Sequence, residues 1–262
     1  MNEKYNQKYS EDLFNRIERN KPASIGKLVS FLQPKYFANE IIINDSYGLK
    51  NNSKNQRIYI SNHISNLDPL FVWLSFHRKN IEMPMIPSIN ALDQPLLKVI
   101  GLDFGKMGSY FLNGNISEKT RNLTDNGRDF FIFPEGEINY NGIPFKKFET
   151  GILKNIIYDV QKDFDIIPVG IKYDYRIEGN NPKNMENINK DKFLGMLKYY
   201  GLNSFYFGKR IVSNFFGSKM GRAEISFGKS KSLSELINQN SSRKIKVEKI
   251  KEYSLSEIVK LS

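Results

Sequence analysis

A histidine and an aspartate that could handle a proton lie five positions apart in the stretch 62–68, which reads NHISNLD. On a continuous helix, positions i and i+5 project about 140° apart, so the two side chains meet only if the backbone turns between them. Residues 57–60 are typical of a strand, and Pro69 opens an apolar run. We therefore expect a strand-to-helix loop with Asp68 at the N-cap and Pro69 at the first helical position.

A second polar element follows the apolar run 130–133, which is typical of a strand that Pro134 ends. Glu135 and Gly136 are thereby placed at the carboxyl end of a strand, where ligands bind in open α/β sheets. The sequence thus combines a proton-handling pair with a downstream substrate or anion turn.

Four motifs in order resemble the glycerolipid acyltransferase family, typified by lysophosphatidic acid acyltransferase. They are Asn62-His63 with Asp68, Phe133-Pro134-Glu135-Gly136, Phe145-Lys146 with Gly151, and Ile167-Pro168-Val169. The likeness runs from about residue 40 to 236, and the two motifs H-x4-D and F-P-E-G are far more specific together than alone. It implies an α/β fold with a mainly parallel central sheet flanked by helices, preceded by N-terminal amphipathic helices.

In acyl transfer from a thioester, the acceptor hydroxyl loses its proton as it attacks the carbonyl carbon. His63 is the candidate general base, and Asp68 would fix its tautomer and stabilise the imidazolium. No covalent acyl-enzyme is needed. Ser61 and Ser65 lie nearby, but neither stands in a G-x-S-x-G turn, which disfavours a serine nucleophile.

The resemblance also assigns substrate-binding residues. Phe133, Glu135 and Gly136 belong to the element that shapes the acceptor site. Pro168 matches the family's fourth element, and we expect it to shape the acyl or acceptor pocket.

The phosphate-binding arginines of the family are missing. Family members commonly follow Glu-Gly with Thr-Arg-Ser, whereas residues 137–139 here are Glu-Ile-Asn, and Lys106 is the nearest cation in the preceding element. Lysine is a point charge that cannot reproduce bidentate guanidinium contacts. Lys106 and Lys146, with Asn139 at the same rim, are the candidates to bind an acceptor phosphate.

This departure leaves the acceptor open. The commonest family reaction, acylation of 1-acylglycerol-3-phosphate to phosphatidic acid, is the first expectation. The alternatives are glycerol-3-phosphate, a lyso-ornithine or other amine-bearing lyso-lipid, or hydrolysis of a thioester or lipid by the same His-Asp pair. A non-enzymatic nucleic-acid or membrane-binding module would leave the motif order unexplained.

Composition narrows the chemistry. The 262 residues suffice for one domain with a sizeable core. The absence of cysteine excludes disulfides, thiolate metal ligands and a cysteine nucleophile, and with only two histidines, His63 and His77, we expect no metal site. We expect no cofactor, with acyl-CoA or an acyl carrier protein as donor co-substrate.

The net charge of +11 predicts an anionic partner, such as phospholipid or an acidic carrier protein. The segment 193–222 holds eight aromatic and five basic residues and no acidic residue, which predicts membrane contact. No run approaches the ~18 apolar residues that span a bilayer. We therefore expect a peripheral protein at the cytoplasmic face of an anionic membrane, with no transmembrane helix and no bound nucleic acid.

The chain is expected to divide into an N-terminal amphipathic helical region at 1–39, an α/β acyltransferase domain at 40–240, and a basic C-terminal helix or tail at 241–262. Apolar runs predict six strands that alternate with helices, as in a mainly parallel sheet. These runs lie at 40–43, 57–60, 84–88, 129–133, 165–173 and 223–227.

Overall fold

The computed structural model describes residues 40–47, 54–65, 68–79, 81–82, 84–88, 109–111, 116–136, 138–139, 147–174, 221–238 and 240–261. The N-terminal region 1–39, Lys106, Lys146 and residues 193–220 of the basic aromatic segment lie outside them.

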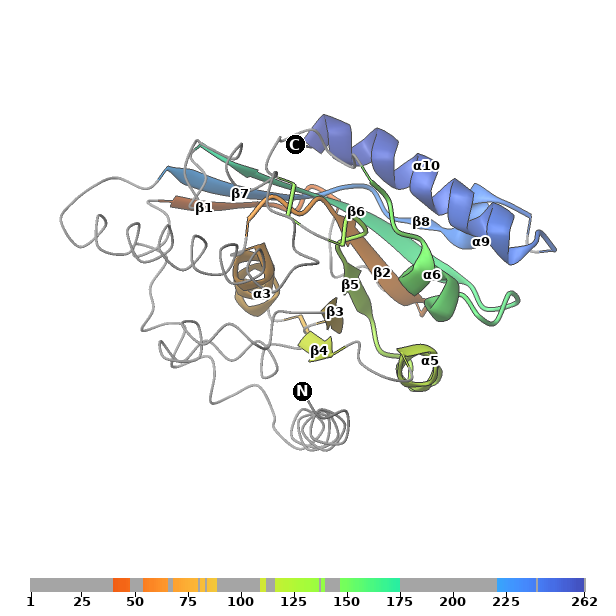
Figure 1. Ribbon diagram of the computed structural model, residues 1–262. Coiled ribbons are helices and arrows are strands. Elements are labelled where there is room, and N and C mark those ends of the chain that lie inside the picture. The colour runs from red at the N-terminus through yellow and green to blue at the C-terminus, as the bar shows by residue number, and fades with distance from the viewer. Residues whose placement is uncertain are drawn as a thin grey trace, which may run out of the picture.

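A six-stranded sheet forms the centre of the described structure (Figure 1). Its strands stand in the order β1-β7-β6-β2-β5, and β8 also pairs with β6. Their bounds are β1 (Glu40–Asn44), β2 (Gln56–Ser61), β5 (Phe130–Ile132), β6 (Phe164–Tyr173), β7 (Arg222–Phe227) and β8 (Lys231–Ser232). All of these strands except β8 were expected from the apolar runs.

The sheet is mixed, with parallel pairing at the strands that carry the motifs. β2 runs parallel to both β5 and β6, whereas β7 and β8 run antiparallel to β6, and β1 runs parallel to β7. A smaller parallel pair, β3 (Ile86–Ser88) with β4 (Ser109–Phe111), connects to β5 through a bridge between Met85 and Phe130. Because β2, β5 and β6 are parallel, their carboxyl ends lie at the same end of the sheet.

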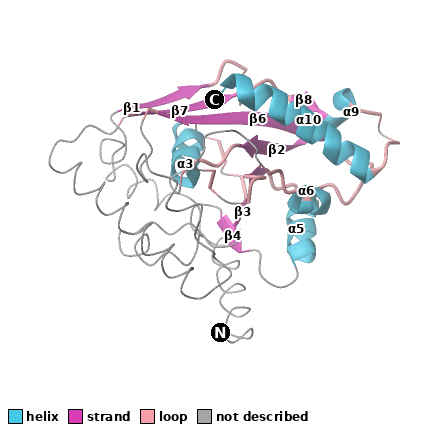
Figure 2. Ribbon diagram, turned by 45° about the horizontal axis from the view of Figure 1, so that its top comes forward, coloured by secondary structure: helices cyan, strands magenta, loops and turns pink. Residues whose placement is uncertain are grey.

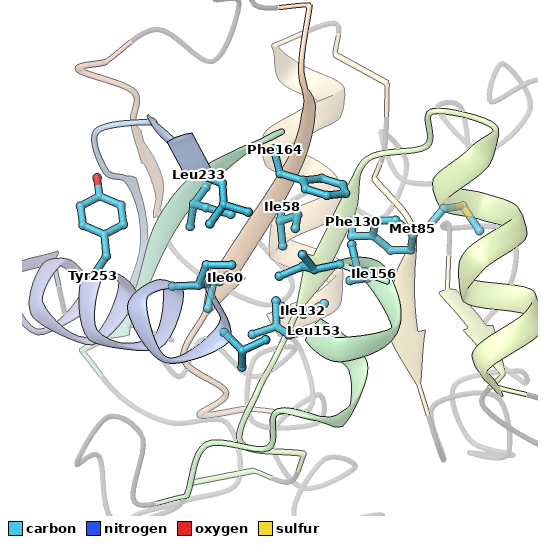
Figure 3. Packing of buried hydrophobic residues seen from close by; sticks show 14 of the residues in the cluster. Ile58, Ile60, Met85, Phe130, Ile132, Leu153, Ile156, Phe164, Leu233 and Tyr253 are labelled. Atoms are coloured by element: carbon cyan, nitrogen blue, oxygen red, sulfur yellow. The ribbon is translucent and has the colours of Figure 1, made fainter. Parts of the chain in front are cut away.

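One face of the sheet is covered by α10 (Arg243–Leu261) and α6 (Gly151–Ile156), together with α9 (Leu233–Leu236) and α5 (Ile116–Asp125). Alternate residues of each strand point to this face, as the period of two requires. Figure 3 shows Ile58, Ile60, Ile132, Leu153 and Ile156 converging there, and all five are buried. The C-terminal segment expected as a helix or tail is thus a helix over most of its length.

The opposite face carries α3 (Asp68–Arg78), which lies across the sheet from α10 (Figure 2). Tyr59 of β2 meets Phe76 of α3 edge to face at 4.9 Å between ring centroids, and it also contacts Phe131 and Phe227. The geometry of such aromatic pairs adds to the stabilisation from burial alone. This cluster fixes α3, and therefore the loop that precedes it, against the strands.

Pro168 lies inside β6, where a proline usually removes a ladder hydrogen bond. Its carbonyl accepts a hydrogen bond from the Gly228 amide at 2.8 Å. The nitrogen of a strand residue faces the same edge as its carbonyl. Along that edge β8 pairs with residues 165–166 and β7 with residues 169–173, so Pro168 occupies the gap between these two partners.

Candidate active site

The loop from β2 to α3 leaves the sheet at Asn62, whose side chain is buried. The Asn62 amide donates to the Ile171 carbonyl and accepts from the Ile171 amide, both at 2.8 Å. The Asn62 side-chain amide thus bonds both backbone polar groups of Ile171, as a backbone amide of a neighbouring strand would. The contact between β2 and β6 therefore continues one residue beyond Ser61. The position from which His63 departs is therefore fixed by the neighbouring strand.

Asp68 closes the loop. Its amide donates to the Ser65 carbonyl at 3.1 Å, and its Oδ2 accepts from the amides of Ile64 and Ser65 at 2.7 and 3.0 Å. The helix begins at Asp68 itself, one position earlier than an N-cap at Asp68 would give, a difference within the usual scatter of helix ends. The carboxylate thus stabilises the loop upstream of the helix and is fully buried.

His63 completes the predicted pair, with its Nδ1 lying 2.8 Å from Asp68 Oδ2. A carboxylate only accepts hydrogen bonds, so Nδ1 carries the proton and Nε2 of the neutral ring is left as a proton acceptor. The His63 side chain is 18% exposed, whereas that of Asp68 is 0% exposed. The imidazole is thus oriented from the protein interior and accessible from outside.

The turn at residues 133–136 lies beside this ring. Phe133 stacks on His63 with 4.5 Å between ring centroids and 29° between ring planes. The Gly136 amide donates to the Phe133 carbonyl at 3.1 Å, and Gly136 adopts a φ of +70°, a conformation that glycine adopts at little cost. Glu149 braces the turn from outside, since its amide donates to the Pro134 carbonyl at 2.6 Å.

The backbone of His63 is held by the residues that follow β5. The His63 carbonyl accepts from the Asn139 amide at 2.6 Å, and the His63 amide makes a long contact of 3.4 Å with Glu135 Oε1. Both Glu135 and Asn139 are buried. The two motifs, 72 positions apart, therefore form one cluster at the carboxyl ends of β2 and β5.

Pro168 is the remaining predicted site residue that the structure describes. It belongs to the interior of β6, and its Cβ lies near the Cβ position of Gly228, close to the end of α10. Lys106 and Lys146 lie outside the described residues. Among the described residues, no group of three or more His, Asp or Glu side chains is arranged to hold a metal ion.

Tyr173, the last residue of β6, belongs to the site although no sequence pattern pointed to it. Its hydroxyl donates to Asp68 Oδ1 at 2.6 Å across 105 positions of the chain. Only the register of β6 against β2 brings the two residues together, and a tyrosine that ends an apolar strand is otherwise ordinary.

The mixed sheet thus presents an oriented imidazole at the carboxyl ends of its parallel strands, beside a turn that bears a buried glutamate. The profile of the family described as Acyltransferase matches residues 44–172, which include both motifs. Residues 44–172 therefore form a domain of this acyltransferase family.

The fold is also similar to a solved structure, the 1-acyl-sn-glycerophosphate (LPA) acyltransferase PlsC from Thermotoga maritima. The TM-score is 0.52 at 15% sequence identity, and the match covers 97% of this chain and 88% of that one. No individual curated protein matches the sequence. None of the helices within the described ranges has the length and apolar character required to cross a bilayer.

Proposed function

We propose that this acyltransferase moves a fatty acyl group from a thioester of coenzyme A or acyl carrier protein to the free hydroxyl of a lyso-glycerophospholipid. The first acceptor to test is 1-acylglycerol-3-phosphate, which would give phosphatidic acid. Two comparisons support this choice, namely the family to which residues 44–172 belong and the fold shared with an enzyme whose name states that acceptor.

The observation that carries the proposal is the 2.8 Å contact between His63 Nδ1 and Asp68 Oδ2. It leaves Nε2 as a base on a partly exposed ring that Phe133 supports on one face. General base catalysis of this kind contributes roughly 10²- to 10⁴-fold.

The proposed reaction needs no other proton carrier. Nε2 takes the hydroxyl proton while the acceptor oxygen forms its bond to the thioester carbonyl carbon. Asp68 stabilises the imidazolium that results. As the tetrahedral intermediate collapses, the carbon–sulfur bond breaks and the imidazolium returns the proton to the departing sulfur, so an ester and a free thiol leave.

The acceptor site would be formed on the β5 side of His63. We expect the buried Glu135 and the turn at Gly136 to shape it, together with Asn139, whose amide donates to the His63 carbonyl. We keep Lys106 and Lys146 as candidate phosphate-binding cations on the basis of the sequence. The same pair could activate water, which makes hydrolysis the competing outcome.

A product screen tests the proposal. The purified chain is given 1-acylglycerol-3-phosphate, glycerol-3-phosphate or a lyso-ornithine lipid with each of the two donors, and products are identified by mass spectrometry. We expect an acylated lipid and stoichiometric free thiol. Free fatty acid without acylated lipid would contradict the proposal in favour of hydrolysis.

The two histidines of the chain supply a matched pair of variants. His63→Ala should lower turnover by roughly 10²- to 10⁴-fold, whereas His77→Ala should leave it near the wild-type rate. Circular dichroism should show the same fold in both. Transfer by His63→Ala at the wild-type rate would exclude His63 as the base.

A further inference from the structure

One short segment of β6 contacts both ends of the loop that carries His63. Ile171 binds the side chain of Asn62 through two hydrogen bonds, and Tyr173, two residues later on the same strand, donates to Asp68 at 2.6 Å. Asn62 and Asp68 lie at the two ends of the loop, so their contacts with β6 determine the position of His63 between them.

The two oxygens of the Asp68 carboxylate have different partners. Oδ2 faces the His63 ring and the amides of Ile64 and Ser65, whereas Oδ1 receives the Tyr173 hydroxyl. The terminal torsion of an aspartate is broad and roughly two-fold, so the carboxylate can rotate unless both oxygens are held. A donor on Oδ1 opposes this rotation.

The Tyr173 side chain is held in position by contacts with two neighbouring elements. Tyr173 pairs with Ala223 of β7, and its ring packs against Phe71 of α3 at 5.5 Å between centroids. The next residue, Asp174, is tied to Arg222 through its amide at 3.0 Å. The hydroxyl is therefore directed by the sheet and by α3 together.

We propose that Tyr173 is a positioning residue that holds Asp68 Oδ1 so that Oδ2 stays directed at His63 Nδ1. This role rests on the proposed function, in which His63 is the base. It extends the His-Asp pair to a third residue, supplied by a strand distant in sequence.

The proposal predicts a change at the imidazole when the hydroxyl is removed. Without this hydrogen bond the carboxylate is free to rotate about its terminal torsion, and Oδ2 is directed at His63 Nδ1 for a smaller share of the time. The proton on Nδ1 is then less favoured, and the share of the other neutral tautomer rises.

The experiment uses Tyr173→Phe in the full chain, which keeps the ring against Phe71. The imidazole nitrogens of His63 are followed by NMR as a function of pH in a His77→Gln background, where they give the only histidine signals. We expect the share of the Nδ1–H tautomer to fall. We also expect kcat to fall about tenfold, which is less than the full contribution of a general base.

A matched control removes a second tyrosine–aspartate hydrogen bond. The Tyr158 hydroxyl donates to Asp125 on the protein surface, so Tyr158→Phe makes the same chemical change away from the site. It should leave both the His63 tautomer ratio and kcat unchanged. If Tyr173→Phe does not fold, Tyr173→Leu tests the same point with another apolar side chain.

Failure of the positioning role and failure of the proposed function give different results. A His63 tautomer ratio in Tyr173→Phe equal to that of the wild type would overturn the positioning role, even where the wild type transfers acyl groups. An absence of acyl transfer by the wild type would overturn the proposed function, and the tautomer ratio measured by NMR would still decide whether Tyr173 positions Asp68.

Discussion

At the scale of single residues, Asp68 combines a structural and a chemical function in one carboxylate. Its four donors among the described residues include two backbone amides that shape the loop and one imidazole that would handle the proton. For any substitution of Asp68, both the stability and the turnover of the variant should therefore be measured.

Asp68→Asn separates the two functions. The amide oxygen can still accept from His63 and the loop amides, while the amide nitrogen can donate to the Tyr173 oxygen. The fold should persist, but the negative charge that stabilises the imidazolium is lost, so kcat should fall by roughly 10²- to 10⁴-fold. Steady-state kinetics and thermal unfolding measure both effects.

Asp68→Ala is the companion variant. It leaves buried donors without an acceptor and should destabilise the chain clearly more than Asp68→Asn does. An Asp68→Asn enzyme with the wild-type kcat would show that the charge of Asp68 has no part in catalysis.

Tyr59 supplies a prediction about pH and stability. Burial raises its pKa to about 12 from 10.0, an effect that the nearby Arg57 partly offsets. The unfolded chain therefore releases this proton at lower pH than the folded one. The stability that depends on the protonated hydroxyl is intact below pH 10 and is lost between about pH 10 and 12.

Tyr59→Phe removes this titration. Between pH 9 and 11 the free energy of unfolding of the wild type should fall by about 1 kcal/mol more than that of the variant, as linkage predicts. Urea unfolding at both pH values measures the difference. Parallel curves for the two proteins would show that Tyr59 keeps its ordinary pKa in the folded state.

The site shows which contacts a sequence can predict. His63, Asp68 and Glu135 were expected to meet, because each follows a strand whose carboxyl end could be recognised from an apolar run and a breaking residue. The contact of Tyr173 with Asp68 depends on strand register over 105 positions, which no local pattern encodes.

At the scale of elements, prediction succeeded for the strands that lie within a recognised apolar run, including the three-residue β3 and β5, and missed β4 and β8. β4 and β8 have three and two residues, too few for a period of two to stand out. The six-residue helix α6 is similarly short, and its burial comes from packing against the sheet and α10. Such elements form because their neighbours are already in place.

The contact of α10 with the sheet requires small residues on the strands. A Cβ added at Gly170 of β6 would lie 2.5 Å from the Leu261 Cβ and 2.9 Å from its backbone carbon. Gly170→Ala should therefore displace the end of α10 and lower stability by roughly 1–3 kcal/mol, as overpacking does. Chemical denaturation measures this loss.

Gly151, at the start of α6, is the matched control because an added Cβ there meets nothing within 4 Å. Gly151→Ala should be neutral or slightly stabilising. Equal stability of the two alanine variants would mean that α10 does not pack as closely on β6 as the structure places it.

At the scale of the whole molecule, the cluster around His63 lies at one edge of the sheet, and an excess of positive charge is spread over the chain. A net charge of +11 attracts anionic surfaces in general, but a lyso-lipid acceptor has to be reached at a membrane. The segment 193–222 combines cations with aromatic side chains, which favour the headgroup level of a bilayer. We propose it as the part of the chain that contacts the membrane.

Flotation with vesicles of stated composition tests this last prediction. The protein should bind vesicles that contain anionic phosphatidylglycerol, bind phosphatidylcholine vesicles weakly, and dissociate as salt is raised. Lys209→Glu with Arg210→Glu should weaken binding by roughly 30-fold or more, because each cation near an anionic surface contributes about 1 kcal/mol. Lys244→Glu with Lys249→Glu, at exposed positions of α10, lowers the net charge equally and should weaken binding far less. Equal losses for the two pairs would mean that total charge, and not the basic aromatic segment, brings the enzyme to its substrate.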